Sequence, residues 1–297
     1  MASPTMPHIT QQPSDHRLIL TISCPDRVGI VAAVSALIAS WKGWILEASY
    51  HADDDSKWFF MRNEILASSL PFGAEEFRAR FAELAAQFDM TWNLSDTASP
   101  RRVVILVSKQ DHCLSDLLHR WRSGELSFDL RCVISNHDDL RSFVQWHKVP
   151  YHHVPVSPAN KADAFAQVQI IIVQEQAETI VLARYMQILP PALCEQFSGR
   201  VLNIHHSFLP SFVGARPYHQ AFDRGVKLIG ATCHYVTAEL DAGPIIEQDV
   251  IRVDHSDTPD EMMRLGRDVE KNVLARGLRL HLQDRVLVHR NKTIIFG

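Results

Sequence analysis

The sequence predicts an α/β protein with two domains, and three observations support this prediction. The chain has 297 residues, which is enough for two domains that each bury a core. Hydrophobic residues make up 46% of the chain and charged residues 22%, as is typical of folded globular proteins. Strand and helix patterns alternate along the chain and are interrupted by a polar stretch at 95–100, which predicts a domain boundary there.

The first domain is expected to span residues 16–95, after a polar leader at 1–15 that lacks the apolar core of a signal peptide. Its strand patterns cover 17–24, 44–51, 58–65 and 90–94, and its helix patterns cover 29–40 and 75–88. The order βαββαβ predicts a ferredoxin-like fold. A linker at 96–101 follows it.

The second domain is expected to span residues 102–297 and to hold a mostly parallel, Rossmann-like sheet. Its strand patterns cover 102–107, 128–135, 151–154, 179–183, 201–205 and 228–236, and the helix patterns between them cover 138–146, 162–176 and 190–197. Thr258 and Glu261 form a capping box that predicts a long helix, and 285–289 with 293–296 predict a small hairpin at the end.

Composition excludes several function classes. The formal charge of −4 and the lack of a dense Lys/Arg run argue against a nucleic-acid partner. Apolar runs such as 170–173 are far too short to span a membrane. Five cysteines without paired spacing suit a reducing cytoplasm. The sixteen histidines show no metal-binding spacing, so we expect no metal site.

The most informative stretch holds an amide, an imidazole and a carboxylate at the ends of predicted strands. Asn203 and His205 are two residues apart on one strand, so they face the same side near its carboxyl end, where open α/β sheets bind ligands. Asp241 follows the next strand and precedes Gly243-Pro244. An oxyanion donor, a base and a carboxylate that orients it suit acyl transfer. The pattern Asn-x-His alone is also common in purely structural positions.

The wider pattern adds Leu209-Pro210, Gly214-Ala215-Arg216-Pro217-Tyr218 and Leu240-Asp241-Ala242-Gly243-Pro244. From about Arg102 to the end, the chain resembles the formyltetrahydrofolate-using enzymes. The resemblance implies that Asn203, His205 and Asp241 are the catalytic residues of a formyltransferase-type domain. It also implies a role in one-carbon metabolism and purine biosynthesis.

The resemblance further implies a folate cleft. The segment Met186-Gln187-Ile188-Leu189 matches the part of the family that reads the pterin ring through its backbone. Val236 and Glu239, which precede Asp241, are expected to frame the same ring. On its own, the segment 186–189 fits an apolar plug at a strand end better, and the triad beside it is what favours folate.

Differences within the family indicate the reaction. A phosphate cradle for glycinamide ribonucleotide needs glycines after the first strand of the sheet, but Ser108–Leu114 contains none and Asp111 would repel a phosphate. Methionyl-tRNA formyltransferases usually carry a basic C-terminal extra domain, whereas the extra domain here is N-terminal. The chain therefore most resembles formyltetrahydrofolate deformylases, which hydrolyse 10-formyltetrahydrofolate to formate and tetrahydrofolate. The alternatives are a formyltransferase to a small amine and a non-catalytic folate or amino-acid sensor.

The roles that the resemblance implies form a mechanism. Asn203 donates to the formyl oxygen, His205 takes a proton from water, and Asp241 orients the imidazole or the water. The sequence leaves open whether His205 or Asp241 is the primary base. No cofactor is expected besides the folate substrate.

The loop between the first strand and the first helix carries a second candidate site. Asp26, Arg27, Gly29 and Ile30 resemble the effector loop of ACT domains, which bind amino acids in metabolic enzymes. The resemblance implies an amino-acid effector and a homo-oligomer, because ACT domains commonly pair edge to edge. The structural alternative is that Asp26 caps the helix and Gly29 permits close packing.

Overall fold

The computed structural model describes residues 16–211 and 217–297, which fold into two compact units. Apart from Phe296, the first unit ends at Ser99 and the second begins at Pro100. The expected leader at 1–15 and the motif residues 214–216 lie outside the described residues.

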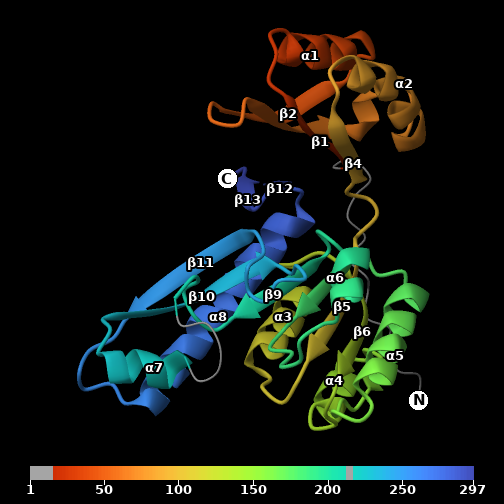
Figure 1. The fold of residues 1–297 in the computed structure, drawn as a ribbon. Coiled ribbons are helices and arrows are strands. Elements are labelled where there is room, and N and C mark those ends of the chain that lie inside the picture. Colours follow the sequence, from red (N-terminus) through yellow and green to blue (C-terminus); the bar gives the residue numbers. More distant parts are fainter. Residues whose placement is uncertain (1–15, 212–216) are drawn as a thin grey trace, which may run out of the picture. The chain divides into compact units, whose positions relative to one another are not determined.

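The first unit is a four-stranded antiparallel sheet with two helices on one face (Figure 1). Its elements are β1 (Arg17–Pro25), α1 (Ile30–Ser40), β2 (Trp44–Asp53), β3 (Trp58–Leu66), η2 (Ala67–Ser69), α2 (Ala74–Gln87) and β4 (Thr91–Asp96), in the sheet order β2-β3-β1-β4. This confirms the ferredoxin-like prediction. β4 runs two residues beyond the expected strand, because Ser95 and Asp96 pair with Ile19 and Leu18 of β1.

The core of the first unit lies between the helices and the sheet. Alternate residues of β1 face the helices, so Leu18, Leu20 and Ile22 pack against Phe77 and Phe81 of α2. β2 is an edge strand of the sheet, and Trp44, Leu46 and Tyr50 on it are exposed. An edge strand offers unpaired backbone groups to another strand.

The second unit is a seven-stranded sheet in the order β11-β10-β9-β8-β5-β6-β7. Its strands are β5 (Arg102–Val107), β6 (Asp129–Ser135), β7 (Tyr151–His153), β8 (Thr179–Leu182), β9 (Val201–His205), β10 (Leu228–Tyr235) and β11 (Ile245–Arg252). The first five of these are parallel, whereas β10 and β11 are antiparallel to their neighbours. A separate hairpin of β12 (Val286–His289) and β13 (Lys292–Ile295) follows. This arrangement confirms the mostly parallel α/β fold.

Helices cover both faces of this sheet (Figure 1). α3 (His112–Arg122), α4 (Arg141–Trp146) and α8 (Pro259–Leu282) contribute to one apolar cluster with Val103 and Ile105, and α5 (Lys161–Gln174) and α6 (Pro191–Gln196) contribute to the other with Val104 and Leu106. The alternation along β5 is that of a strand buried on both faces. Within the described residues, no helix is both long and apolar enough to cross a membrane.

The sequence missed three elements of the second unit: α3, α7 (Pro217–Arg224) and β11. β11 reads Ile-Ile-Glu-Gln-Asp-Val-Ile-Arg, and its polar centre hides the alternation because it is an edge strand. α3 and α7 are rich in polar residues and have low mean hydropathy. The helix expected at 138–146 begins only at Arg141, and that expected at 162–176 ends at Gln174. The capping box at Thr258 and Glu261 is confirmed, because each side chain bonds the other's backbone N–H.

The connections leave β5 toward β6 and β7 and then return to β8 and β9 on its other side. The connections therefore lead to opposite sides of β5, and the carboxyl ends of β5 and β8 form the topological switch point. Ligands of open α/β sheets bind in the crevice that forms there.

The buried His281 makes the stability of the second unit depend on pH. Burial and the nearby Arg101 hold its pKa at about 3, against about 6.5 in an unfolded chain. The stability that this neutral ring contributes is present above pH 6.5 and is lost as the pH falls toward 3. Between these pH values, the contribution of His281 to the free energy of unfolding falls by about 1.4 kcal/mol per pH unit.

His281→Gln should make the free energy of unfolding depend less steeply on pH between pH 6.5 and pH 4. The slope measured in denaturant titrations should decrease by the amount that corresponds to about one proton. His255 is exposed, so His255→Gln is the matched control and should keep the wild-type slope. Equal slopes in all three proteins would show that His281 does not titrate in this way.

Candidate active site

Three side chains of the candidate site come from two paired strands. Asn203 and His205 lie on β9, and His234 lies on β10 directly opposite Asn203 in the antiparallel register. His205 and His234 are buried, and Asn203 is half-buried. As predicted from the spacing, Asn203 and His205 lie in the same group, near the carboxyl end of β9.

A tight turn after β10 brings Asp241 to these residues. Asp241 has a φ of 54°, in the left-handed region. Two residues later, a Cβ on Gly243 would overlap the carbonyl oxygen of Tyr235, so only glycine fits. The backbone N–H of Tyr235 then donates to the carbonyl of Pro244 at 2.9 Å. The Asp-Ala-Gly-Pro motif thus returns the chain and places the carboxylate beside β9.

His205 is held by Asp241 on one side of its ring and is free on the other. Its Nδ1 lies 3.3 Å from Asp241 Oδ2. Its Nε2 is buried and has no hydrogen-bond partner among the described residues. A carboxylate accepts the proton of Nδ1, which leaves a lone pair on Nε2. The ring is therefore in the tautomer of a base.

His234 was not expected from the sequence, and it orients the amide of Asn203. Its Nδ1 donates to the carbonyl oxygen of Tyr235 at 2.9 Å, so its Nε2 must accept from Asn203 Nδ2 at 3.1 Å. Burial lowers the pKa of His234, which keeps the ring neutral in this role. His234 is the next-to-last residue of β10, and its role depends on strand pairing with Asn203, which the sequence does not show.

Asp241 remains ionised although it is largely buried. Burial pushes its pKa upward, but the hydrogen bond with His205 and the nearby imidazoles outweigh burial and lower the pKa below its usual value. The second carboxylate oxygen lies 3.8 Å from His234 Nε2. A charged carboxylate at this place favours the protonated form of His205 when that ring takes up a proton.

The residues expected to contact folate follow β8 and β10. The side chains of Met186 and Ile188 are 57% and 58% exposed, which is unusual for large apolar groups and leaves them open to a ligand. Gln187 is half-buried. Leu189 is buried in an apolar cluster, and Val236 is partly buried and packs against the same cluster. Glu239 is exposed, and its carbonyl accepts from Thr237 Oγ1.

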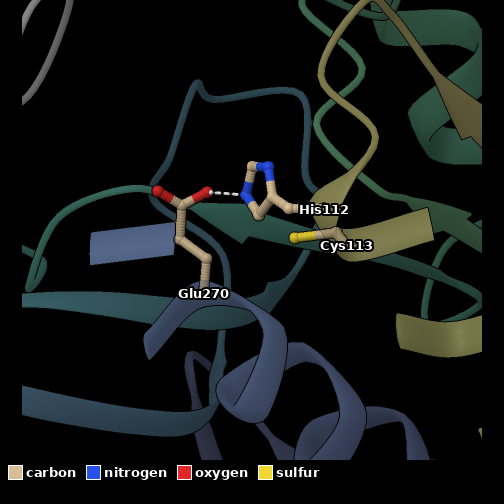
Figure 2. A group of neighbouring side chains, drawn as sticks. All are labelled: His112, Cys113 and Glu270. Atoms are coloured by element: carbon tan, nitrogen blue, oxygen red, sulfur yellow. Dashed lines mark hydrogen bonds and ion pairs between the residues drawn. The ribbon is translucent and has the colours of Figure 1, made fainter. Parts of the chain in front are cut away.

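A second buried cluster surrounds the carboxylate of Glu270, near His206. Glu270 accepts from Tyr218 Oη at 2.7 Å and from His112 Nε2 at 2.8 Å (Figure 2), and Arg184 Nε lies 3.4 Å from the same carboxylate. Burial pushes the pKa of Glu270 upward, but His112 and Arg184 together hold it below its usual value. A Cβ on Gly266 would overlap the hydroxyl of Tyr218, so this glycine makes room for the cluster.

His112, Cys113 and Glu270 also form a group with metal-ligand chemistry, since one donor atom of each lies within 4.8 Å of the others (Figure 2). The group fits a cation poorly. The guanidinium of Arg184 already neutralises Glu270 and would repel a cation. Burial raises the pKa of the Cys113 thiol well above its usual value, which disfavours the thiolate that metals bind.

The expected effector loop of the first unit joins β1 to α1. Gly29 is the N-cap residue of α1, with a φ of 98° and no side-chain hydrogen bond to the helix. The alternative in which Asp26 caps the helix is therefore wrong. Arg27 pairs with Asp89 at 2.6 Å, and Ile30 is buried in the core. Asp26 is exposed, so its carboxylate is accessible to solvent.

The fold and the site define an α/β enzyme that acts on an acyl or formyl group, since they combine an amide donor, an imidazole base and a carboxylate at strand ends. A family model described as Formyl transferase matches residues 101–278. The chain is 45% identical over 279 residues to the formyltetrahydrofolate deformylase of Bacillus subtilis (strain 168), covering 94% of this chain and 93% of the other.

Solved structures agree with this match. The chain resembles a formyltetrahydrofolate deformylase from Pseudomonas syringae pv. tomato with a TM-score of 0.95, 62% identity and 96% coverage of both chains. A glycinamide ribonucleotide transformylase from Symbiobacterium toebii has a TM-score of 0.64 and 28% identity, over 69% of this chain and 98% of the other. The chain belongs to the formyltetrahydrofolate deformylases of the formyl transferase family.

Gly243→Ala should displace the turn that holds Asp241. We expect kcat for formate release to fall by roughly tenfold or more, because small displacements of a positioned group are costly. Gly73→Ala is the matched control, since a Cβ there meets nothing within 4 Å. An unchanged kcat in a folded Gly243→Ala protein would contradict the role of this turn.

Proposed function

We propose that the protein hydrolyses 10-formyltetrahydrofolate to formate and tetrahydrofolate, with water as the acceptor. The observation that carries this proposal is the free Nε2 of His205, whose Nδ1 faces the ionised Asp241. The family relationship supports the substrate, because the named relatives are formyltetrahydrofolate deformylases.

The first step is the attack of water on the formyl carbon. His205 Nε2 accepts a proton from the water, and Asp241 stabilises the imidazolium that results. The Asn203 amide has two hydrogens on Nδ2, and His234 accepts only one of them. The other donates to the formyl oxygen as it becomes an oxyanion, which is worth about 3 kcal/mol in the transition state.

The second step breaks the bond between the formyl carbon and N10. His205 returns its proton to N10, so that tetrahydrofolate leaves together with formic acid, which loses its proton to water and becomes formate. We assign the primary base to His205 rather than Asp241, because His205 Nε2 has no partner among the described residues, whereas the carboxylate of Asp241 already faces His205 Nδ1. His205 is neutral again after this step, and the scheme uses no metal ion or further cofactor.

The pterin ring is proposed to lie against Met186, Gln187, Ile188 and Leu189, with Val236 and Glu239 on the opposite side. The exposure of Met186 and Ile188 supports this, since a flat aromatic ring would cover them. We infer a cytoplasmic protein, because all five cysteines are buried and unpaired, which suits a reducing compartment.

The two units are proposed to be an ACT-type regulatory domain at 16–95 and a catalytic domain at 102–297, joined by a linker at 96–101. An amino acid would bind at Asp26, Arg27, Gly29 and Ile30, where the positive end of α1 suits a carboxylate and Asp26 suits an ammonium group. The exposed apolar residues Trp44, Leu46 and Tyr50 on β2 support a homo-oligomer paired along this edge.

Replacement of the site residues tests the catalytic assignment. His205→Ala should lower kcat by roughly 10²–10⁴-fold, and Asn203→Ala by roughly 10²–10³-fold. Asp241→Asn should also lower kcat, because it removes the charge that stabilises the imidazolium. Formate release without any amine acceptor is the measurement, with tetrahydrofolate affinity measured in parallel by calorimetry.

The affinity for tetrahydrofolate should stay close to that of the wild type in all three variants. The exposed His255 provides the control, since His255→Ala should retain full activity. Near-normal turnover by any of the three site variants would overturn the assignment of that residue.

Effector binding is tested on the full-length chain. Calorimetric titration with a panel of amino acids should give heat for at least one of them, and the same amino acid should change the rate of formate release. Asp26→Ala should abolish both effects while hydrolysis without effector continues. The effector proposal fails when no amino acid gives heat with the wild-type protein.

A further inference from the structure

The Arg184 cluster, which consists of Arg184, Gln110, Glu270, His112 and Tyr218, has no part in the proposed mechanism. Arg184 Nε donates to Gln110 Oε1 at 3.0 Å and lies 3.4 Å from Glu270 Oε2. The side chains of Arg184 and Glu270 are only 7% and 1% exposed. Burying charges in this way is costly, so a functional reason should be sought.

The cluster lies at the topological switch point between β5 and β8. The backbone N–H of Ser108, which follows β5, donates to the carbonyl of Arg184 at 3.2 Å. The N–H of Met186 donates to Ser108 Oγ at 2.9 Å. Open α/β sheets place a ligand in the crevice at this point. Gln110 follows β5 and Arg184 follows β8, so the cluster lies at this point.

The backbone of Arg184 indicates that its side chain matters. Its φ is 62°, in the left-handed region that favours glycine. Residues held there against their preference concentrate at functional sites. Glycine would adopt this backbone conformation with less strain than arginine. The feature that arginine supplies at this position is its buried guanidinium.

A cavity of about 150 Å³ adjoins the cluster and stops short of the candidate active site. Arg184, His206 and Glu270 line it, whereas Asn203, His205 and Asp241 do not. The ring of His206 lies 5.2 Å from that of His205. His206 therefore adjoins both the cavity and the base, and Arg184 lines the cavity beside it.

We propose that the buried Arg184–Glu270 pair is a nucleophile filter that closes the crevice beside His205 to amines and leaves water as the acceptor. The inference rests on the proposed hydrolysis and explains its specificity. A water molecule needs only about 30 Å³, whereas an amine must bring its carbon chain into the crevice. The guanidinium also repels the protonated form of an amine.

The filter predicts a defined reaction when it is removed. The amine nitrogen attacks the formyl carbon, and the bond from that carbon to N10 breaks. The proton lost by the amine passes through His205 to N10. The products are an N-formyl amine and tetrahydrofolate, with no change in oxidation state.

The test is the partition of the formyl group between glycinamide and water in Arg184→Gly. Wild-type protein with 10-formyltetrahydrofolate and glycinamide should yield formate and almost no N-formylglycinamide. The ratio of N-formylglycinamide to formate should rise by roughly tenfold or more in the variant. This ratio is independent of the amount of active enzyme, so a general loss of activity does not change it.

Two further variants keep the test decisive. Arg184→Gly/Glu270→Gln removes the unpaired buried charge that could hinder folding, and it should show the same rise. Arg267 lines the same cavity but is exposed, so Arg267→Ala should keep the wild-type ratio. Folded variants at position 184 that hydrolyse the substrate with an unchanged ratio would overturn the filter. Absence of hydrolysis by the wild type without amine would instead overturn the proposed function.

Discussion

The tight return from β10 to β11 is the constraint on which the candidate site depends. Strand pairing alone brings Asn203 and His234 together, because they are opposite each other in the register of β9 and β10. The carboxylate belongs to no strand and reaches His205 only because Gly243 lets the chain pass against Tyr235. Without this turn, the base would lose the group that fixes its tautomer and stabilises its charged form.

The two buried histidines of the site have opposite tasks, and directional hydrogen bonds assign them. His234 donates to Tyr235 and accepts from Asn203, so both of its nitrogens are engaged and it stays neutral. Among the described residues, His205 has a partner at Nδ1 and none at Nε2, so it can exchange a proton at Nε2. In the proposed mechanism, one ring therefore orients the oxyanion donor, while the other moves protons. This division explains why a site of one amide and one carboxylate contains two imidazoles.

The sequence predicted the elements that hydrophobic periodicity and residue spacing encode. The βαββαβ order, the strands 102–107 and 201–205 and the capping box at Thr258 are confirmed, because buried strands and capped helices carry strong local patterns. The edge strand β11 was missed, since its polar centre reflects exposure rather than pairing. His234 and Arg184 were missed for a different reason. Their roles arise from partners that are distant in the chain, Asn203 and Glu270, which no local pattern shows.

The fold alone does not determine which nucleophile the site uses. The transformylase from Symbiobacterium toebii shares the sheet at 28% identity, and its name assigns it an amine-bearing nucleotide as acceptor. A fold shared between two reactions leaves the choice to side chains at the site. In this chain, the side chains at the switch point include a buried ion pair and its hydrogen-bond partners. Such a pair contributes little net stability, because desolvation offsets its attraction. We therefore explain the presence of this pair by its exclusion of amines from the crevice rather than by a contribution to the stability of the core.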